Sequence, residues 1–255
     1  MNRLHMHRFA ILSLGPVLAS FGAATAWADP VTILSSGHAD IFEVEYEQVE
    51  AETPTLHLGV HTDDGHYEPA DVLLQVKNAA YTSTTGLPGS ITTLLGSNAW
   101  ILPADTEAAA NLGVLEAGVA RAGFPEGAGA VTFTLLSSGS SNPGNFALFT
   151  SGNALRLSAI GGTVGTGSFS LSSGHTHFNW GFSAPGIYTF DMQASYSDPS
   201  YGPLQSPVET YTFQIVPEPS SIALAGLGAA GVLAAGWRRR RRAAARNSVV
   251  AEIAG

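Results

Sequence analysis

The sequence predicts an all-β protein, an antiparallel β-sandwich of the Ig-like or jelly-roll kind with a short helical insertion. Most segments between Asp29 and Val216 alternate apolar and polar residues with a period of two. That pattern is typical of strands with one solvated face. Turn-rich breaks such as TSTTGLPGS and SSGSSNPG separate the segments. We expect a signal helix before this domain and a transmembrane helix after it.

The N-terminal segment, residues 1–28, has the features of a secretory signal peptide. Arg3 and Arg8 give it a positive start, and an apolar stretch leads to the small-residue pattern Ala-Trp-Ala. Signal peptidase cuts after such a pattern, so the exported chain is expected to begin at Asp29. An uncleaved membrane anchor is the alternative, and the shortness of the apolar run disfavours it.

The predicted strands follow one another along residues 29–216. Residues 41–49, IFEVEYEQV, place aromatic and aliphatic side chains on one face and glutamates on the other. In residues 55–61, TLHLGVH, His57 and His61 point outward. Further strands are expected at residues 71–79, 131–138, 145–152, 176–182, 187–197 and 209–216.

One segment departs from the strand pattern. Residues 103–120, PADTEAAANLGVLEAGVA, are rich in alanine, the residue with the highest helix propensity. We expect a short helix or helical loop here, inserted at one end of the sandwich.

The C-terminal segment resembles the PEP-CTERM sorting signal, which would occupy residues 217–242. Pro217, Glu218 and Pro219 match the motif, an uncharged stretch of 17 residues follows, and five consecutive arginines close it. As a helix the uncharged stretch would span about 25 Å, close to the thickness of a bilayer core. The arginines should stay cytoplasmic, with residues 243–255 as a short cytoplasmic tail.

The resemblance to the PEP-CTERM signal implies a partner and a destination. In that family an exosortase recognises the motif and passes the protein to the envelope or the outside. We therefore expect a secreted, envelope-associated protein, anchored in the membrane through the C-terminal helix before processing.

Charge and composition limit the partners of the exported domain. The whole chain carries a net charge of −9, but residues 29–216 hold 18 acidic residues against Lys77, Arg121 and Arg156, a net charge of −15. Such a surface repels nucleic acid and anionic lipid and can attract cations. The chain has no cysteine, so a metal site would have to use His, Asp, Glu, carbonyl or water ligands.

Two short histidine motifs predict a metal site. His175 and His177 lie two residues apart, so on a strand they share a face with Cα atoms about 6.6 Å apart. His38 and Asp40 repeat that spacing, and Asn179 would continue the face of the first pair. One ion could bridge the pairs if the two strands lie close together; otherwise the histidines are simply polar residues on a solvated face.

The loop after residue 61 offers further ligands. His57 and His61 would be about 13 Å apart on one strand, too far to share an ion. His61 is favoured because His66 and several carboxylates follow in HTDDGHYEPAD. The hypothesis is therefore a single site with His38, Asp40, His61, His66, His175 and His177 as candidate ligands.

Several blocks resemble the choice-of-anchor M domain, also called the actinobacterial surface-anchored protein domain. They include GHADIFEVEYE, LHLGVHTDDGHYEPADVLL and GHTHFNWGFSAPGIYTF. The most specific block is matched by His175, His177, Asn179, Trp180, Phe182, Ala184, Pro185 and Gly186. Such domains are often encoded near ABC transporters associated with metal ions, so the resemblance implies metal binding and a metal ABC transporter as partner.

Three functions follow as hypotheses. The leading one is a non-enzymatic, surface-displayed protein that binds zinc, copper or manganese. Imidazole with carboxylate suits zinc and copper best, and a ligand set richer in oxygen would favour manganese or calcium. The second is a structural or adhesive component of the exopolysaccharide matrix, with exposed tyrosines stacking on sugars. The third is a metal-dependent hydrolase, which the absence of Gly-x-Ser-x-Gly, His-Glu-x-x-His and phosphate-loop motifs disfavours.

Overall fold

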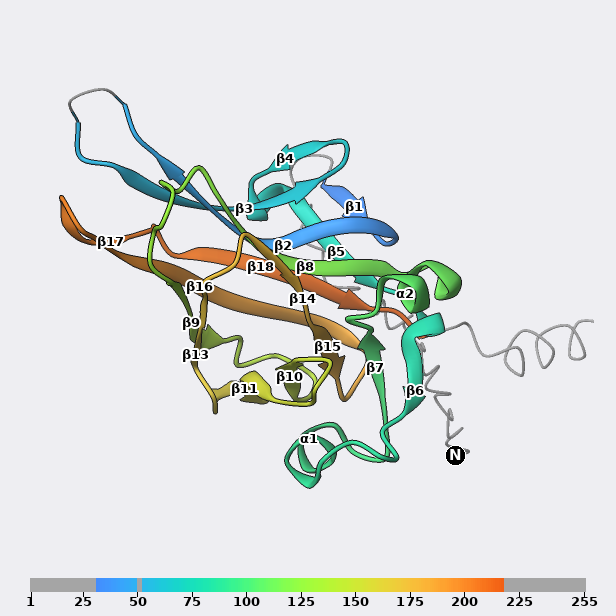
Figure 1. The fold of residues 1–255 in the computed structure, drawn as a ribbon. Helices are drawn as coiled ribbons and strands as arrows, with labels where there is room; N and C mark the ends of the chain where they lie inside the picture. The colour runs from blue at the N-terminus through green and yellow to red at the C-terminus, as the bar shows by residue number, and fades with distance from the viewer. Residues whose placement is uncertain (1–30, 50–51, 218–255) are drawn as a thin grey trace, which may run out of the picture. The chain divides into compact units, whose positions relative to one another are not determined.

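The computed structural model describes residues 31–49 and 52–217, which form three β-sheets (Figure 1). The predicted signal segment 1–28, Glu218 and Pro219 of the sorting motif, and the predicted transmembrane helix with the tail 243–255 lie outside the described residues. Within the described part of the chain, the helices are all too short or too polar to cross a bilayer.

The largest sheet is mixed and has seven strands. Its order is β1 (Thr32–Leu34), β5 (Val72–Val76), β18 (Glu209–Ile215), β16 (Gly186–Asp198), β9 (Val131–Ser138) and β13 (Ser168–Leu171), with β17 (Gly202–Gln205) paired to β16. Strand β5 runs parallel to both of its neighbours, and the other pairs are antiparallel.

A second sheet has six strands and is antiparallel throughout. Its order is β12 (Thr163–Val164), β11 (Leu155–Ile160), β10 (Phe146–Phe149), β15 (Asn179–Phe182), β7 (Asn98–Leu102) and β6 (Tyr81–Ser83). Helix α1 (Gly89–Leu95) buries Ile91 and Leu95 against this sheet in a small separate core.

The third sheet has five strands and carries the histidine motifs; we call it the histidine sheet. Its order is β14 (His175–His177), β8 (Leu115–Ala122), β2 (Gly37–Glu47), β3 (Thr55–Thr62) and β4 (Gly65–Tyr67). Strands β2 and β8 are parallel and the other pairs are antiparallel. The remaining elements are helix α2 (Thr106–Leu112) and the 3-10 turns η1 (Pro69–Asp71) and η2 (Asn78–Ala80).

Aromatic side chains from all three sheets form the main core. The ring of Phe42, on β2, lies 4.8 Å from both the Trp180 ring of β15 and the Tyr211 ring of β18. The Tyr211 hydroxyl donates to the carbonyl of Gly59 on β3. Buried aromatic area of this kind is a large stabilising term. This packing fixes which side chains of the histidine sheet point into the core. The side chains on its outer face are therefore fixed as well.

The all-β prediction is confirmed, but the expectation of purely antiparallel sheets is wrong. Strand pairs β1–β5, β5–β18 and β2–β8 are parallel, and the strands form three sheets where two were expected. Alternation indicates a strand with one solvated face, which is typical of antiparallel sheets, but a mixed sheet can place a parallel neighbour beside such a strand.

The predicted helical insertion is helical only in its first half. Helix α2 starts at the N-cap Asp105, whose side chain accepts a hydrogen bond from the Ala108 amide at 2.7 Å, and it ends at Gly113 in the left-handed conformation. The second half is β8, which lies between β14 and β2. There the burial of Ala117 and Val119 outweighs the helix propensity of alanine.

The strand predicted over residues 176–182 is divided between two sheets. It breaks at Phe178, which is buried and packs edge-on against the Phe169 ring at 5.3 Å. His175 and His177 therefore belong to the histidine sheet. Asn179 belongs to the six-stranded sheet, where its side chain accepts from the Ala104 amide and donates to the Thr150 carbonyl. The expectation that Asn179 shares the face of the histidine pair is wrong.

Candidate metal centre

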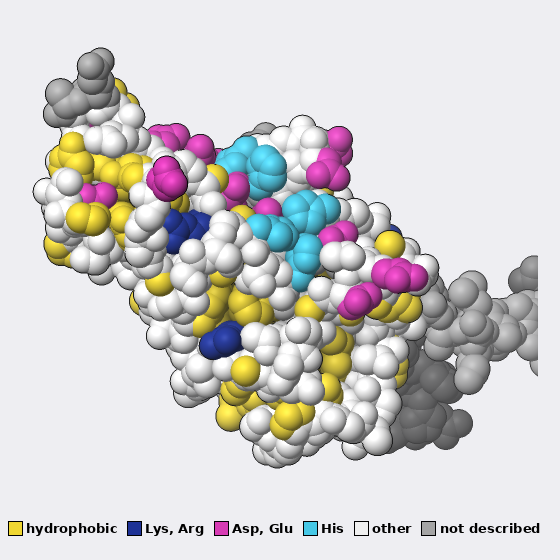
Figure 2. All heavy atoms as spheres, viewed as in Figure 1, with side chains coloured by type: hydrophobic (Ala, Val, Ile, Leu, Met, Phe, Trp, Pro, Cys, Tyr) yellow, Lys and Arg dark blue, Asp and Glu magenta, His cyan; other side chains and the backbone are white. Residues whose placement is uncertain are grey.

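A single cross-strand row on the histidine sheet collects most of the candidate ligands. The register aligns, from β14 to β4, the residues His177, Gly118, Asp40, His61 and His66. A second row aligns His175, Ala120, Glu43 and Gly59. Figure 2 shows histidine side chains gathered on one face and flanked by acidic ones. Ligands from distant segments are thus neighbours because of strand order.

Three imidazoles converge at the β14 side of the sheet; we call His38, His175 and His177 the histidine triad. One nitrogen from each ring lies within 4.8 Å of one from each of the others. The Nε2 atoms of His175 and His177 are 3.0 Å apart. Two ligands held about 2.0–2.1 Å from a tetrahedral ion would be about 3.3–3.4 Å apart, so the rings need to move little to share one.

The triad is assembled over a residue that has no side chain. Gly118, on β8, lies between Asp40 on one neighbouring strand and His177 on the other. A Cβ atom at Gly118 would collide with Asp40 Oδ1 and would lie 2.8 Å from His175 Cε1. The glycine therefore opens the space through which side chains from β2 and β14 meet across β8.

Asp40 lies beside two rings of the histidine triad. Its side chain is 8% exposed, and Oδ1 lies 2.7 Å from His175 Nδ1 and 3.9 Å from His38 Nε2. No donor among the described residues is aligned for a hydrogen bond to this oxygen. A buried carboxylate without a full partner is costly, and a nearby cation relieves that cost. Carboxylates behind metal-binding imidazoles also fix the ring orientation.

A second group of ligands lies on the β4 side; we call Glu43, His61 and His66 the glutamate triad. Their ligand atoms also fall within 4.8 Å of one another. Glu43 reaches this face because β2 has a β-bulge between Asp40 and Glu43, which inserts one residue relative to both neighbouring strands. Without the bulge, residues three apart on a strand would point to opposite faces.

Burial shifts the pKa of one residue in each group. Burial raises the pKa of Glu43, although the nearby His61 and His66 oppose the shift. Burial, helped by the neighbouring His175, lowers the pKa of His177. A lowered pKa keeps the His177 imidazole neutral at pH 7, the form that binds metal ions.

The structure therefore separates the ligands that the sequence hypothesis joined into one site. His38, Asp40, His175 and His177 lie together, while His61 and His66 lie with Glu43. His57 contacts Glu47 and Thr55 and belongs to neither group. Metal binding by either group stays a prediction.

Sequence reasoning missed two acidic residues near the ligands. Glu116 Oε1 lies 3.4 Å from His177 Nε2, and it comes from the segment expected to be helical. Glu43 was not among the predicted ligands. One signal was available: polar residues occupy even positions at His38 and Asp40, whereas apolar residues occupy even positions from Phe42 onward. Such a change of phase within one strand is typical of a bulge.

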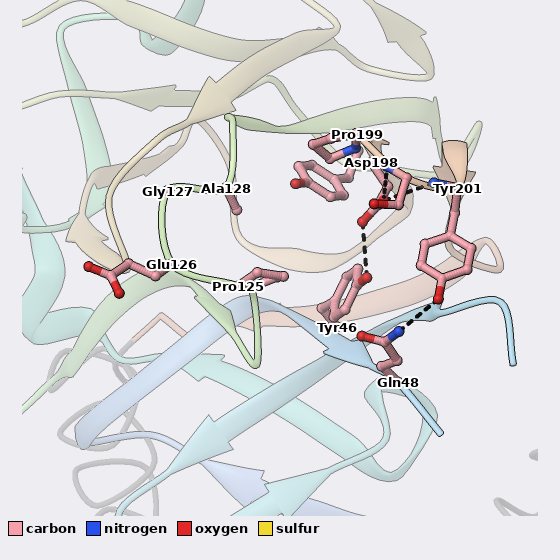
Figure 3. Close-up of a pocket in the computed structure, with 11 residues that line it drawn as sticks. Tyr46, Gln48, Pro125, Glu126, Gly127, Ala128, Asp198, Pro199 and Tyr201 are labelled. Carbon is pink, nitrogen blue, oxygen red and sulfur yellow. Dashed lines mark hydrogen bonds between the residues drawn. The ribbon is translucent and has the colours of Figure 1, made fainter. Parts of the chain in front are cut away.

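A hollow away from the histidines lies among β2, the loop after β8 and the turn between β16 and β17 (Figure 3). Asp198 lines it: Oδ1 accepts from the amides of Ser200 and Tyr201, and Oδ2 accepts from the Tyr46 hydroxyl at 2.9 Å. Both carboxylate oxygens are thus hydrogen-bonded, and the bond from Tyr46 links β2 to β16. Tyr201 remains 43% exposed at the rim.

Comparison with known proteins identifies only the C-terminal signal. Residues 216–241 match the PEP-CTERM protein-sorting motif. No curated protein and no solved structure matches the chain. The motif implies export, sorting to the cell envelope and processing by an exosortase. Pro217, the first residue of the motif, is exposed just after β18.

Proposed function

We propose that the exported domain binds a divalent metal ion through the histidine triad and displays it at the cell envelope without catalysing a reaction. The observation that supports this most is the convergence of His38, His175 and His177 beside a buried Asp40 oxygen that lacks an aligned donor. Three imidazoles with one open position are a donor set that zinc and copper favour. Manganese is the third candidate.

The accessibility of the triad supports reversible binding. The side chains of His38, His175 and His177 are 26%, 39% and 18% exposed. An ion could therefore reach them and leave without any movement of the backbone. Three hollows on the described surface are lined by other residues. A site on an open sheet face suits ion capture better than catalysis, which usually encloses the substrate.

The resemblance to the choice-of-anchor M domain supports the same proposal. Its most specific block contains His175 and His177, both members of the triad. A metal ABC transporter is then a reasonable recipient of the ion. The C-terminal helix would hold the protein in the membrane until the exosortase acts.

Calorimetric titration of the purified protein with zinc or copper at pH 7.5 tests the proposal. We expect saturable binding that a His175→Ala/His177→Ala variant weakens by at least about tenfold, because both rings supply nitrogen ligands. His57→Ala is the matched control, since His57 is a half-exposed histidine of the same sheet outside both groups. Equal binding by all three proteins would rule out the triad.

A structural or adhesive role in the polysaccharide matrix is the second candidate. The observation that favours it is the hollow of Figure 3, where Tyr201 is exposed and Gln48 donates to its hydroxyl at 3.0 Å. Exposed aromatic rings stack on sugars. Under this role a Tyr201→Ala variant would lose attachment to the matrix and the His175→Ala/His177→Ala variant would keep it. The metal-binding role predicts that the histidine variant changes the phenotype.

A further inference from the structure

We infer that the glutamate triad is a second metal site, separate from the histidine triad and built from a different donor set. Glu43 Oε2 lies 3.1 Å from His66 Nδ1 and 3.7 Å from His61 Nδ1. One carboxylate oxygen and two imidazole nitrogens leave a fourth position open for water. That set is one of the ligand combinations of open zinc sites. The inference extends the proposed function to a second ion, and either can fail alone.

The burial of Glu43 indicates that a cation belongs beside it. Its side chain is 9% exposed, although it lies on the outer face of the sheet. Oε2 has no aligned hydrogen-bond donor, and among the described residues no lysine or arginine forms an ion pair with it. An ionised carboxylate in such a place is unfavourable unless a positive charge accompanies it. A divalent ion between Glu43 and the two rings supplies that charge.

The backbone around Glu43 is shaped to hold His66 over it. Gly59, on β3, is the register partner of Glu43. A Cβ atom at Gly59 would collide with His66 Nε2 and would lie 2.9 Å from His66 Cε1. The ring of His66 therefore occupies the space that a side chain at position 59 would fill. The bulge in β2 and this glycine together direct three side chains from three strands to one point.

The ligand atoms form two separate groups on the sheet. In the first row His177 and His61 are separated by β8 and β2, so their Cα atoms are about 14 Å apart at the usual strand spacing. The second site also binds through Nδ1 atoms, whereas His175 and His177 face each other through Nε2. The structure thus provides two neighbouring ligand sets on one sheet face.

Counting bound zinc by equilibrium dialysis and elemental analysis tests the inference on the purified protein. We expect two equivalents in the unsubstituted protein and in the His57→Ala control. Two variants should each keep one equivalent: Glu43→Gln/His66→Ala, which lacks the second site, and His175→Ala/His177→Ala, which lacks the first. Glu43→Gln preserves the shape of the side chain, and circular dichroism verifies that each variant keeps its strands.

The possible results separate the two proposals. One equivalent that only the His175→Ala/His177→Ala variant loses would overturn the second site and leave the proposed function intact. One equivalent that only the Glu43→Gln/His66→Ala variant loses would overturn the proposed function and support the second site. If the unsubstituted protein binds one equivalent and neither variant binds any, the two groups form a single shared site and the inference is overturned. No bound zinc would contradict both.

A Gly59→Ala variant provides a further test that leaves all three ligands in place. The added Cβ displaces the His66 ring, so the protein should bind one equivalent of zinc, or a second one at least about tenfold more weakly. Two equivalents of unchanged affinity in this variant would contradict the geometry on which the second site depends.

Discussion

Two glycines determine where the imidazole rings lie, although neither binds anything itself. Gly118 leaves the space in which side chains of β2 and β14 meet, and Gly59 leaves the space that the His66 ring fills. The ligand motifs in the sequence are thus not sufficient to form the site. It also requires glycines that leave space between the ligands.

A Gly118→Ala variant is expected to weaken metal binding at the histidine triad without altering a ligand. The new Cβ would meet Asp40 and His175, so one of the two must move. Overpacking of this kind costs about 1–3 kcal/mol in stability. Calorimetry should show at least about tenfold weaker zinc binding. Gly174→Ala is the control because a Cβ there meets nothing within 4 Å. Equal affinity in both variants would contradict the role assigned to Gly118.

Tyr46→Phe is expected to reduce stability at neutral pH and to matter less in acid. Burial raises the pKa of Asp198, but hydrogen bonds from the Ser200 and Tyr201 amides and the Tyr46 hydroxyl outweigh it and lower the pKa below its ordinary value. A lowered pKa stabilises the fold above the unfolded value, near 3.8, and this contribution is lost as the pH falls through the folded value.

Urea unfolding of the two proteins at several pH values measures this effect. The difference in unfolding free energy between wild type and Tyr46→Phe should be largest above pH 5 and should shrink below the folded pKa of Asp198. A difference that does not change with pH would show that Tyr46 stabilises the fold by packing alone.

At the residue scale, the sequence identified pairs on one strand better than groups across strands. The spacing of His175 and His177, and of His38 and Asp40, follows directly from the period of a strand. The partner of His61 and His66 did not follow, because Glu43 reaches them only through the bulge in β2. The position of a bulge depends on pairing with neighbouring strands, which a single sequence does not give.

At the scale of elements, Trp180 connects the six-stranded sheet to the histidine sheet. Its side chain is fully buried, and Nε1 donates to the carbonyl of Ala117 on β8 at 3.2 Å. Ala117 precedes Gly118, so this bond holds β8 in place beneath the histidine triad. The strand that carries the tryptophan follows directly after the strand that carries His175 and His177.

Trp180→Phe is expected to lower the free energy of unfolding by roughly 1–3 kcal/mol, since it leaves the Ala117 carbonyl without its donor and creates a small cavity. Trp100→Phe is the matched control. Trp100 is also largely buried, but its Nε1 has no hydrogen-bond partner among the described residues. Chemical denaturation should therefore show a smaller loss of unfolding free energy for Trp100→Phe than for Trp180→Phe. A larger loss for Trp100→Phe would contradict the role of Trp180.

Element types were predicted well where alternation was strong and poorly where composition misled. The buried faces of β3, β9 and β18 follow their period-two patterns. Strand β8 was expected to be helical because it is rich in alanine, yet its small residues suit a strand enclosed between β14 and β2. The small side chains of β8 leave room for the candidate ligands of neighbouring strands. Propensity scales do not describe such a requirement of the tertiary structure.

At the scale of the whole molecule, an exported acidic domain presents two ligand groups on one face and ends at a sorting signal. The net charge of −15 over residues 29–216 favours the approach of cations. The sorting motif could be recognised from the sequence alone because Pro217, Glu218 and Pro219 are contiguous. The candidate metal ligands come from four strands, so grouping them required the fold.

Alanine substitutions at Pro217, Glu218 and Pro219 are expected to block exosortase processing. The matched motif includes all three positions, and it follows directly after β18. Intact-mass measurement of the protein recovered from the envelope should show that the variant keeps its C-terminal segment. Identical masses for wild type and variant would contradict recognition of this motif.

Acidification is expected to release the bound ion. Metal ligation requires neutral imidazole, and protons compete for the ring nitrogens as the pH falls below about 6. The lowered pKa of His177 keeps that ring available above this range. Competition titrations with a zinc indicator between pH 5 and pH 8 should show affinity that is steady near pH 7.5 and falls steeply below about pH 6. Affinity independent of pH would exclude imidazole ligands.

Anomalous diffraction at the zinc absorption edge, from crystals grown with zinc at neutral pH, tests the central claim most directly. The histidine triad predicts a peak about 2.0–2.1 Å from one nitrogen each of His38, His175 and His177. A map from fully loaded protein with no peak bonded to these three rings would contradict it.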